Sequence, residues 1–139
     1  MNASSGPPAI FDARRRAARL ARSERLFAGA DFLHDRAAEN AVHSLDVILR
    51  DFPDAVDLSA HPGPFARQLA ESVAATRVGN VVSVGDPAAR AAPGAQPLPL
   101  ADQSQDLIVS LMSLHWANDL PGALTQIRRA LKTDGLCLG

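Results

Sequence analysis

The feature that most constrains this chain is an apolar run near its carboxyl end that is followed at once by polar and aromatic side chains. Leu107 to Met112 is an apolar run that includes Ile and Val and is interrupted only by Ser110. This pattern is typical of a strand covered on both faces, as in a parallel sheet. Ser113, His115 and Trp116 come directly after the run. The stretch therefore predicts a buried parallel strand with a functional loop at its end.

A helix is predicted after this loop, with Asn118 or Asp119 as its capping residue. Open α/β sheets bind ligands beyond the carboxyl ends of their strands, so we expect Ser113, His115 and Trp116 on the substrate side of a site. His115 is either a polar substrate contact or general base, or a histidine that packs in the loop beside Trp116. We expect Trp116 to form an apolar wall rather than to stack on a cofactor.

Composition narrows the class of protein. The 139 residues carry a formal charge of -1, which does not favour a nucleic-acid partner. No apolar stretch is long enough to cross a bilayer. Cys137 is the single cysteine, which excludes a disulfide framework. His34 and His43 are too far apart for a helical metal pair, and no metal site is expected.

The amino-terminal part is predicted to be helical, with residues 1–10 disordered and residues 11–54 forming a helical segment. Phe11 to Phe27 contains six arginines and allows three interpretations. It is a solvated helix face, a mitochondrial-type presequence, or a surface for an acidic partner. Asp31 to Arg50 has the clearest helical period, and both helices are expected to pack outside the sheet.

Residues 55–139 are predicted to form an α/β domain whose first strand is Ala55 to Leu58. Ser59 to Gly63 then turns into a helix. In α/β folds that bind nucleotides, a glycine-rich turn at this position lets the backbone approach the ligand closely. From the residues alone, a plain strand-to-helix connection is an equal alternative.

The next strand is predicted at Val81 to Val84. Asp86 follows it, where an acidic residue would accept hydrogen bonds from ribose hydroxyls, although Asp86-Pro87 is also an ordinary turn opener. The segment from Asp86 to Leu98 is too short for both a helix and a strand with their connections. We therefore expect a contracted sheet that lacks one strand here.

The stretch from Ser113 to Leu124 (SLHWANDLPGAL) resembles a branch of the class I S-adenosylmethionine-dependent methyltransferases, as do Leu98-Pro99-Leu100 and Asp106 to Val109 upstream. The branch includes the malonyl-carrier-protein methyltransferases of biotin synthesis and the methyltransferase-like assembly factors of respiratory complex I, with their bacterial relatives. The second group is nearer, because its pattern continues through Gln126 to Lys132 and Asp134 to Leu136.

This resemblance implies S-adenosylmethionine as the cofactor and Asp57, Ser59, Gly63 and Asp86 as cofactor-binding residues. The family pattern at the turn is Asp-x-Gly-x-Gly-x-Gly. Asp57 and Gly63 match its ends, whereas Ser59 and His61 replace the middle glycines. We expect His61 to crowd the turn and to require a positive φ. We therefore expect the chain to bind the cofactor weakly or not at all, and glycine at positions 59 and 61 to improve binding, with the larger gain at 61.

The resemblance implies a Rossmann-like class I methyltransferase fold, an α/β three-layer sandwich that is contracted and C-terminally incomplete, so that the chain is a fragment. Two functions are open. The first is an S-adenosylmethionine-dependent enzyme that acts on a protein or carrier-bound substrate, which in the nearer group implies arginine modification of a complex I subunit. The second is a non-catalytic assembly or binding module with a degenerate cofactor turn. With either function, the protein would be located in the bacterial cytoplasm or, in a eukaryote, on the mitochondrial matrix side.

Overall fold

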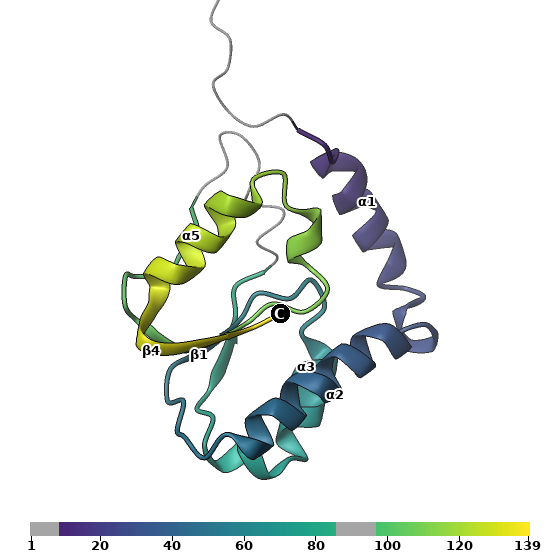
Figure 1. Ribbon diagram of the computed structural model, residues 1–139. Helices are drawn as coiled ribbons and strands as arrows, with labels where there is room; N and C mark the ends of the chain where they lie inside the picture. The colour runs from purple at the N-terminus through teal and green to yellow at the C-terminus, as the bar shows by residue number, and fades with distance from the viewer. Residues whose placement is uncertain (1–8, 86–96) are drawn as a thin grey trace, which may run out of the picture.

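The computed structural model describes residues 9–85 and 97–139, and a parallel four-stranded sheet lies at its centre (Figure 1). The strand order is β2-β1-β3-β4. The strands are β1 (Ala55–Asp57), β2 (Val81–Ser83), β3 (Gln105–Val109) and β4 (Leu131–Leu138). The chain moves outward from β1 to β2 and then returns to the other side of β1. The strand order therefore reverses between β1 and β3, which is where such sheets bind ligands.

Most helices lie close to their predicted positions. They are α1 (Ala13–Ser23), α2 (Phe32–Val47), α3 (Gly63–Ala70) and α5 (Leu120–Ala130), with short 3-10 turns η1 (Phe27–Gly29), η2 (Val73–Thr76) and η3 (Leu114–Trp116). Asp12 caps α1 by accepting the backbone N–H groups of Arg14 and Arg15. Asp119, one of the two predicted caps, accepts the N–H of Gly122 at the start of α5.

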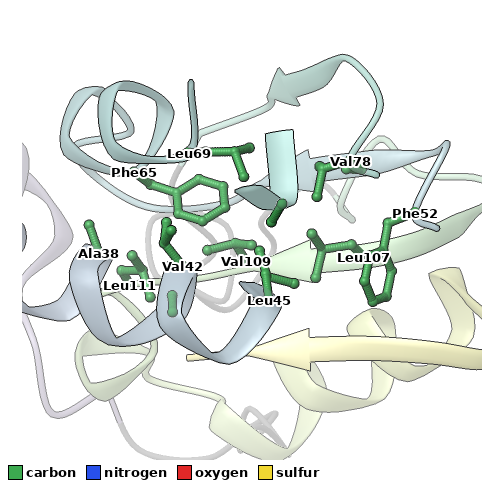
Figure 2. Close-up of a cluster of buried hydrophobic side chains, with 13 residues drawn as sticks. Ala38, Val42, Leu45, Phe52, Phe65, Leu69, Val78, Leu107, Val109 and Leu111 are labelled. Atoms are coloured by element: carbon green, nitrogen blue, oxygen red, sulfur yellow. The ribbon is translucent and has the colours of Figure 1, made fainter. Parts of the chain in front are cut away.

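One face of the sheet is covered by α2 and α3 (Figure 1). Figure 2 shows the cluster between this face of the sheet and the two helices. Leu107 and Val109 of β3, Leu45 of α2 and Phe65 of α3 belong to it. All four side chains are at most 1% exposed. Burying a side chain of this size contributes about 1.5–3 kcal/mol, so this layer is the main source of stability.

The opposite face is covered by α5. Ile127 and Ala130 of α5 pack against Val56, Leu58 and Ile108 from the sheet, and all five side chains are buried. Residues that alternate along β1 and β3 thus point to two separate cores, as expected for a strand covered on both faces. The predicted α/β class and the Rossmann-like three-layer arrangement are confirmed.

The predicted end of the third strand was wrong. The apolar run continues to Met112, but β3 ends at Val109. The Leu111 N–H donates to the Ser59 hydroxyl oxygen rather than to a neighbouring strand, and Met112 has a φ of 55°. Leu111 is buried beside the turn, whereas Met112 is 37% exposed, so burial explains the apolar side chain at position 111 but not the one at position 112.

The basic helix α1 lies outside the sheet but does not pack against it. None of its residues is buried. Figure 1 shows α1 standing apart from the layers formed by α2, α3 and α5. Its apolar residues are mostly alanines, which bury too little surface to hold a helix against a sheet. Contacts at its two ends hold α1 in place and are described with the site.

The strand predicted after Asp134-Gly135 is present, and residues Leu136 to Leu138 pair with Leu107 to Val109. β4 begins earlier than expected, at Leu131, and the register shifts between the two paired parts. Two expectations fall largely outside the described residues. They are the disordered amino terminus, of which only Ala9 and Ile10 are described, and the contraction between Asp86 and Leu98.

Candidate functional site

The turn after β1 is bound to the end of β3 by Ser59. The Ser59 N–H donates to Asp57 Oδ1 at 2.7 Å, and the Ser59 hydroxyl oxygen accepts the N–H of Leu111 at 2.8 Å. Asp57 and Ser59 are each 1% exposed. Ser59 therefore satisfies a buried backbone donor across the switch point. Glycine at this position would leave the Leu111 N–H without its acceptor, so any gain in cofactor binding from that change would come with a loss of stability.

Asp57 is the buried acidic group of the site. Burial raises the pKa of its carboxyl group, although hydrogen bonds from the Ser59 side chain and backbone oppose this shift. Oδ2 of Asp57 has no hydrogen-bond partner among the described residues. Since a buried carboxylate oxygen is costly without a donor, this atom identifies a position where a ligand donor would be stabilised.

A pocket of about 820 Å³ lies over the carboxyl ends of β1 and β3. Its floor is formed by Ala60 and His61, which follow β1, and by Met112, His115 and Trp116, which follow β3. Its remaining wall comes from the amino-terminal segment, namely Ile10, Phe11, Asp12, Arg15, Arg16, Arg19, Leu20, Ser23, Leu26, Phe27, Ala30 and His34. Helix α1 thus forms one side of the pocket although it lies outside the core.

His61 lies in a ring cluster that joins the turn to the amino-terminal segment. Its ring stacks on Phe27 with centroids 4.0 Å apart, and His34 meets Phe27 at 4.9 Å and His61 at 5.1 Å. Burial lowers the pKa of both histidines. The expectation that His61 needs a positive φ was wrong, since among the described residues other than glycine only Gln103 and Met112 have one. His34 is half-buried in this ring cluster, whereas His43 is exposed.

A second contact fixes the other end of α1. Phe11 meets Trp116 edge to face, with ring centroids 5.2 Å apart, and the guanidinium of Arg16 lies 5.7 Å from the centre of the Trp116 ring. The side chain of Asn118, the other predicted helix cap, accepts the N–H groups of Ile10 and Phe11 and donates to the Phe11 carbonyl. Trp116 is therefore an apolar wall for the pocket and a support for α1.

The other predicted site residues are placed differently with respect to the pocket. His115 lines it, is exposed and lies beside Trp116 with ring centroids 5.4 Å apart. Ser113 is 1% exposed and does not line the pocket. Gly63 lies at the start of α3, where an added Cβ would meet no atom within 4 Å. Asp86 lies outside the described residues, directly after Gly85, whose φ is 85°.

Four contributors to the pocket and its support were not predicted from the sequence: Phe11, Phe27, His34 and Asn118. Phe27 and His34 lie more than 25 residues before His61, and periodicity within one helix cannot show a contact over that distance. Phe11-Asp12 was the one usable signal, because it matches the opening of the family pattern, but it does not name Trp116 as the partner.

The part of the chain that the structure describes holds no group of three or more metal-ligating side chains. Within the same ranges, no helix is long and apolar enough to span a membrane. The site is therefore a buried acidic turn beside a pocket with arginine, histidine and aromatic walls. Together with the parallel sheet, this defines a Rossmann-like ligand-binding protein with its site at the carboxyl ends of β1 and β3.

Comparison with known proteins gives the family. The chain matches the methyltransferase-domain family from residue 54 to residue 139, and it belongs to that family. It is 32% identical to arginine-hydroxylase NDUFAF5, mitochondrial, of Rattus norvegicus over 118 residues, which cover 78% of this chain and 34% of the relative. It is 44% identical to malonyl-[acyl-carrier protein] O-methyltransferase of Gallionella capsiferriformans over 41 residues, which cover 30% of this chain and 14% of the relative.

The chain thus spans about a third of the length of the arginine-hydroxylase relative. Among solved structures, it resembles a candidate S-adenosyl-L-methionine-dependent methyltransferase from Methanococcus maripaludis, with a TM-score of 0.50 and 22% sequence identity. The likeness covers 97% of this chain and 66% of that one. This level of identity supports the fold alone.

S-adenosylmethionine is the cofactor of this class of protein, as expected from the sequence. The residues present fit it in two respects. Oδ2 of Asp57 is a buried acceptor without a partner, and the cofactor carries amine and hydroxyl donors. The space beside Gly63 is open, so no side chain blocks the backbone at the start of α3.

Proposed function

We propose that this chain takes part in the transfer of a methyl group from S-adenosylmethionine to an acceptor held on a protein or a carrier protein. The observation that carries the proposal is the Oδ2 atom of Asp57, which is buried at the switch point of the sheet and has no partner among the described residues. Asp57 itself does not line the pocket, but Ala60 and His61 of the turn that follows it do. Asp57 and Gly63 would hold the cofactor, which supplies an electrophilic methyl group when bound. Asp86, which follows β2 in the sequence, would contribute as well.

The chain's own residues would act mainly by positioning, because methyl transfer chiefly requires alignment of donor and acceptor. Trp116 and Phe11 would exclude water from the acceptor. His115 lies on the pocket wall with an exposed ring, so it could accept a proton from the acceptor or make a polar contact with it. Ser113, buried beneath this loop, would hold the loop in place rather than touch the substrate.

Two acceptors follow from the relatives. In the group of the arginine-hydroxylase relative, the resemblance implies modification of an arginine in a subunit of respiratory complex I, on the matrix side of the mitochondrion or in the bacterial cytoplasm. In the group of the malonyl-carrier relative, the acceptor is attached to an acyl carrier protein, as the name of that protein states. The first relative is named for hydroxylation rather than methyl transfer, so what the two groups share is a substrate carried on a protein, and this common property is what we propose.

A second function is favoured by one specific observation. The ring of His61 occupies the cofactor turn and packs on Phe27 and His34, so the turn is stabilised by the chain itself rather than left open for a ligand. In a non-catalytic assembly or binding module, this packing would hold the amino-terminal segment in place for a protein partner. Residues 55–139 would then serve as a methyltransferase-like scaffold.

Calorimetric titration of S-adenosylmethionine tests the first function. We expect measurable binding that weakens at least about tenfold, or about 1.4 kcal/mol, in Asp57→Asn. Asp102→Asn is the matched control, since Asp102 is an exposed acid that pairs with Arg129 away from the pocket. Absence of binding in the unmodified chain would refute the proposal. Binding without transfer of labelled methyl to either acceptor would favour the second function.

A further inference from the structure

Positive charge in this chain is concentrated on α1 and the residues after it. The segment from Phe11 to Arg25 carries six arginines and two acids, whereas the other residues together carry eight basic and thirteen acidic side chains. Five of the six are exposed, namely Arg14, Arg15, Arg19, Arg22 and Arg25. The net charge of the chain is near zero because a strongly basic helix is balanced by an excess of acidic residues in the rest of the chain, here called the acidic body.

The arrangement of these arginines disfavours an isolated helix. Arg16, Arg19 and Arg22 follow one another at three-residue spacing, and like charges at this spacing on one helix face repel each other. Helix faces that only meet solvent usually mix charges of both signs. Arg15 of this helix pairs with Asp12 at 3.6 Å, and both side chains are highly exposed, so this pair offsets little of the repulsion. Such a row is stabilised when an anionic surface lies against it.

The position of α1 connects this charge to the site. Arg15, Arg16 and Arg19 line the pocket, so a partner that lies along α1 also lies at the rim of the pocket. The helix is held at its two ends, by Trp116 and Asn118 on one side and through η1 by His61 on the other. None of its residues is buried, so its outer surface is available along its full length.

The surface fits an acidic protein better than a membrane or a nucleic acid. Leu20 is the only bulky apolar residue of α1, and it lines the pocket, which leaves no apolar face to enter a bilayer. Eleven helical residues extend over about 16 Å, and a longer polyanion would extend beyond them to the acidic body. A protein patch of matching size would meet α1 alone.

We propose that α1 is the docking surface for an acidic face of the protein that carries the acceptor, with its arginines positioning that face at the rim of the pocket. This inference rests on the proposed function for the identity of the partner. The geometry requires acidic side chains that are spaced to meet the arginine row, rather than negative charge alone. Electrostatic complementarity of this kind mainly increases the association rate and the specificity, and it is weakened by salt.

The test uses the full chain and a fluorescent helical peptide with a glutamate row at three- and four-residue spacing. A peptide with the same composition and dispersed glutamates is the first control, and binding is followed by anisotropy. Arg22→Glu is the test variant because Arg22 does not line the pocket. Arg128→Glu is its match, since both are exposed arginines in the last turn of a helix. Thermal unfolding of each variant confirms that it is folded.

We expect the patterned peptide to bind at least about fivefold more tightly than the dispersed one. Arg22→Glu should weaken binding at least about fivefold and Arg128→Glu less than twofold, with loss of binding between about 50 and 200 mM salt. Equal effects of the two variants, or equal binding of the two peptides, would refute the docking surface. So would tighter, Arg22-dependent binding to phosphatidylglycerol vesicles or to a single-stranded oligonucleotide.

Titration of S-adenosylmethionine into the same samples separates this inference from the proposed function. Loss of peptide docking in Arg22→Glu with unchanged cofactor binding supports a surface distinct from the cofactor turn. Docking without any cofactor binding would refute the proposed methyl transfer and leave the docking surface standing. Cofactor binding without docking would refute the docking surface alone.

Discussion

The ring of His61 stacks on the ring of Phe27, with centroids 4.0 Å apart and planes inclined by 21°. This contact joins the cofactor turn after β1 to the segment that carries α1. His61, which replaces a glycine of the family pattern, thus packs the turn after β1 against the amino-terminal wall of the pocket. The substitution at position 61 is therefore part of the packing of this chain as well as a departure from the family pattern.

His61→Gly should loosen the amino-terminal segment. The stacked pair contributes about 0.5–1.5 kcal/mol beyond its buried area, so we expect faster proteolysis between α1 and α2 and a lower Tm. His61→Phe retains a ring and should behave like the unmodified chain in both measurements. If His61→Gly nevertheless binds S-adenosylmethionine more tightly, the ring obstructs the cofactor. If proteolysis is equal in the two variants, the stack does not hold the segment.

Stability should fall as the pH is lowered from about 7.5 to about 5. Burial lowers the pKa of His34 and His61 in the folded chain, with Asp31, Asp35 and Glu24 opposing and Arg16 reinforcing the shift. The unfolded chain therefore binds more protons below the ordinary histidine pKa of about 6.5, and ∂ΔG/∂pH is positive there.

The carboxyl group of Asp57 makes a contribution of the opposite sign, which begins at lower pH. The pKa of Asp57 is raised by burial, which makes stability decrease with rising pH above about 3.8, the ordinary value. Thermal unfolding of the double variant His34→Phe, His61→Phe isolates the histidine part, and the change in Tm between about pH 5 and 7.5 should become smaller or reverse. An unchanged pH dependence would show that the ring cluster does not couple protonation to folding.

Ser59→Gly should destabilise the chain. The Leu111 N–H loses the hydroxyl oxygen that it reaches at 2.8 Å, and a buried donor without a partner costs about 1–3 kcal/mol. We expect Tm to fall by about 3–10 °C, measured by differential scanning fluorimetry. Ser104→Ala is the control, because it removes an exposed hydrogen bond from the Ser104 hydroxyl group to the Ala101 carbonyl oxygen. Equal shifts would contradict the structural role of Ser59.

Two glycines should respond oppositely to alanine. A Cβ at Gly79 would lie 2.1 Å from the Pro53 carbonyl oxygen, and overpacking of this kind costs about 1–3 kcal/mol. A Cβ at Gly63 would meet nothing within 4 Å, so Gly63→Ala should leave folding unchanged or stabilise it by about 0.4–1 kcal/mol. Denaturant unfolding measures both. A loss of S-adenosylmethionine binding in Gly63→Ala, without loss of stability, would indicate close approach of the cofactor there.

The sequence by itself determined the layers of the fold. Apolar runs that alternate with helical periods identified the strands at Ala55, Val81 and Leu107. Strands covered on both faces must be apolar throughout, which holds for the buried residues of β1 and β3, whereas Val82 of β2 is 52% exposed. Asp119 could also be identified as a candidate cap, since capping is a local interaction within one turn. These features depend on neighbours in the chain, and that is why a sequence pattern could predict them.

Only the tertiary structure decided what surrounds the site. The contact of His61 with Phe27, that of Asn118 with Phe11, and the hydrogen bond from Leu111 to Ser59 each join residues that are 34 to 107 positions apart. No local period encodes such contacts, because they form only when the sheet brings the ends of β1 and β3 together. For the same reason, residues Ser110 to Met112 were predicted as strand although β3 ends at Val109, and the contribution of α1 to the wall of the pocket was not predicted.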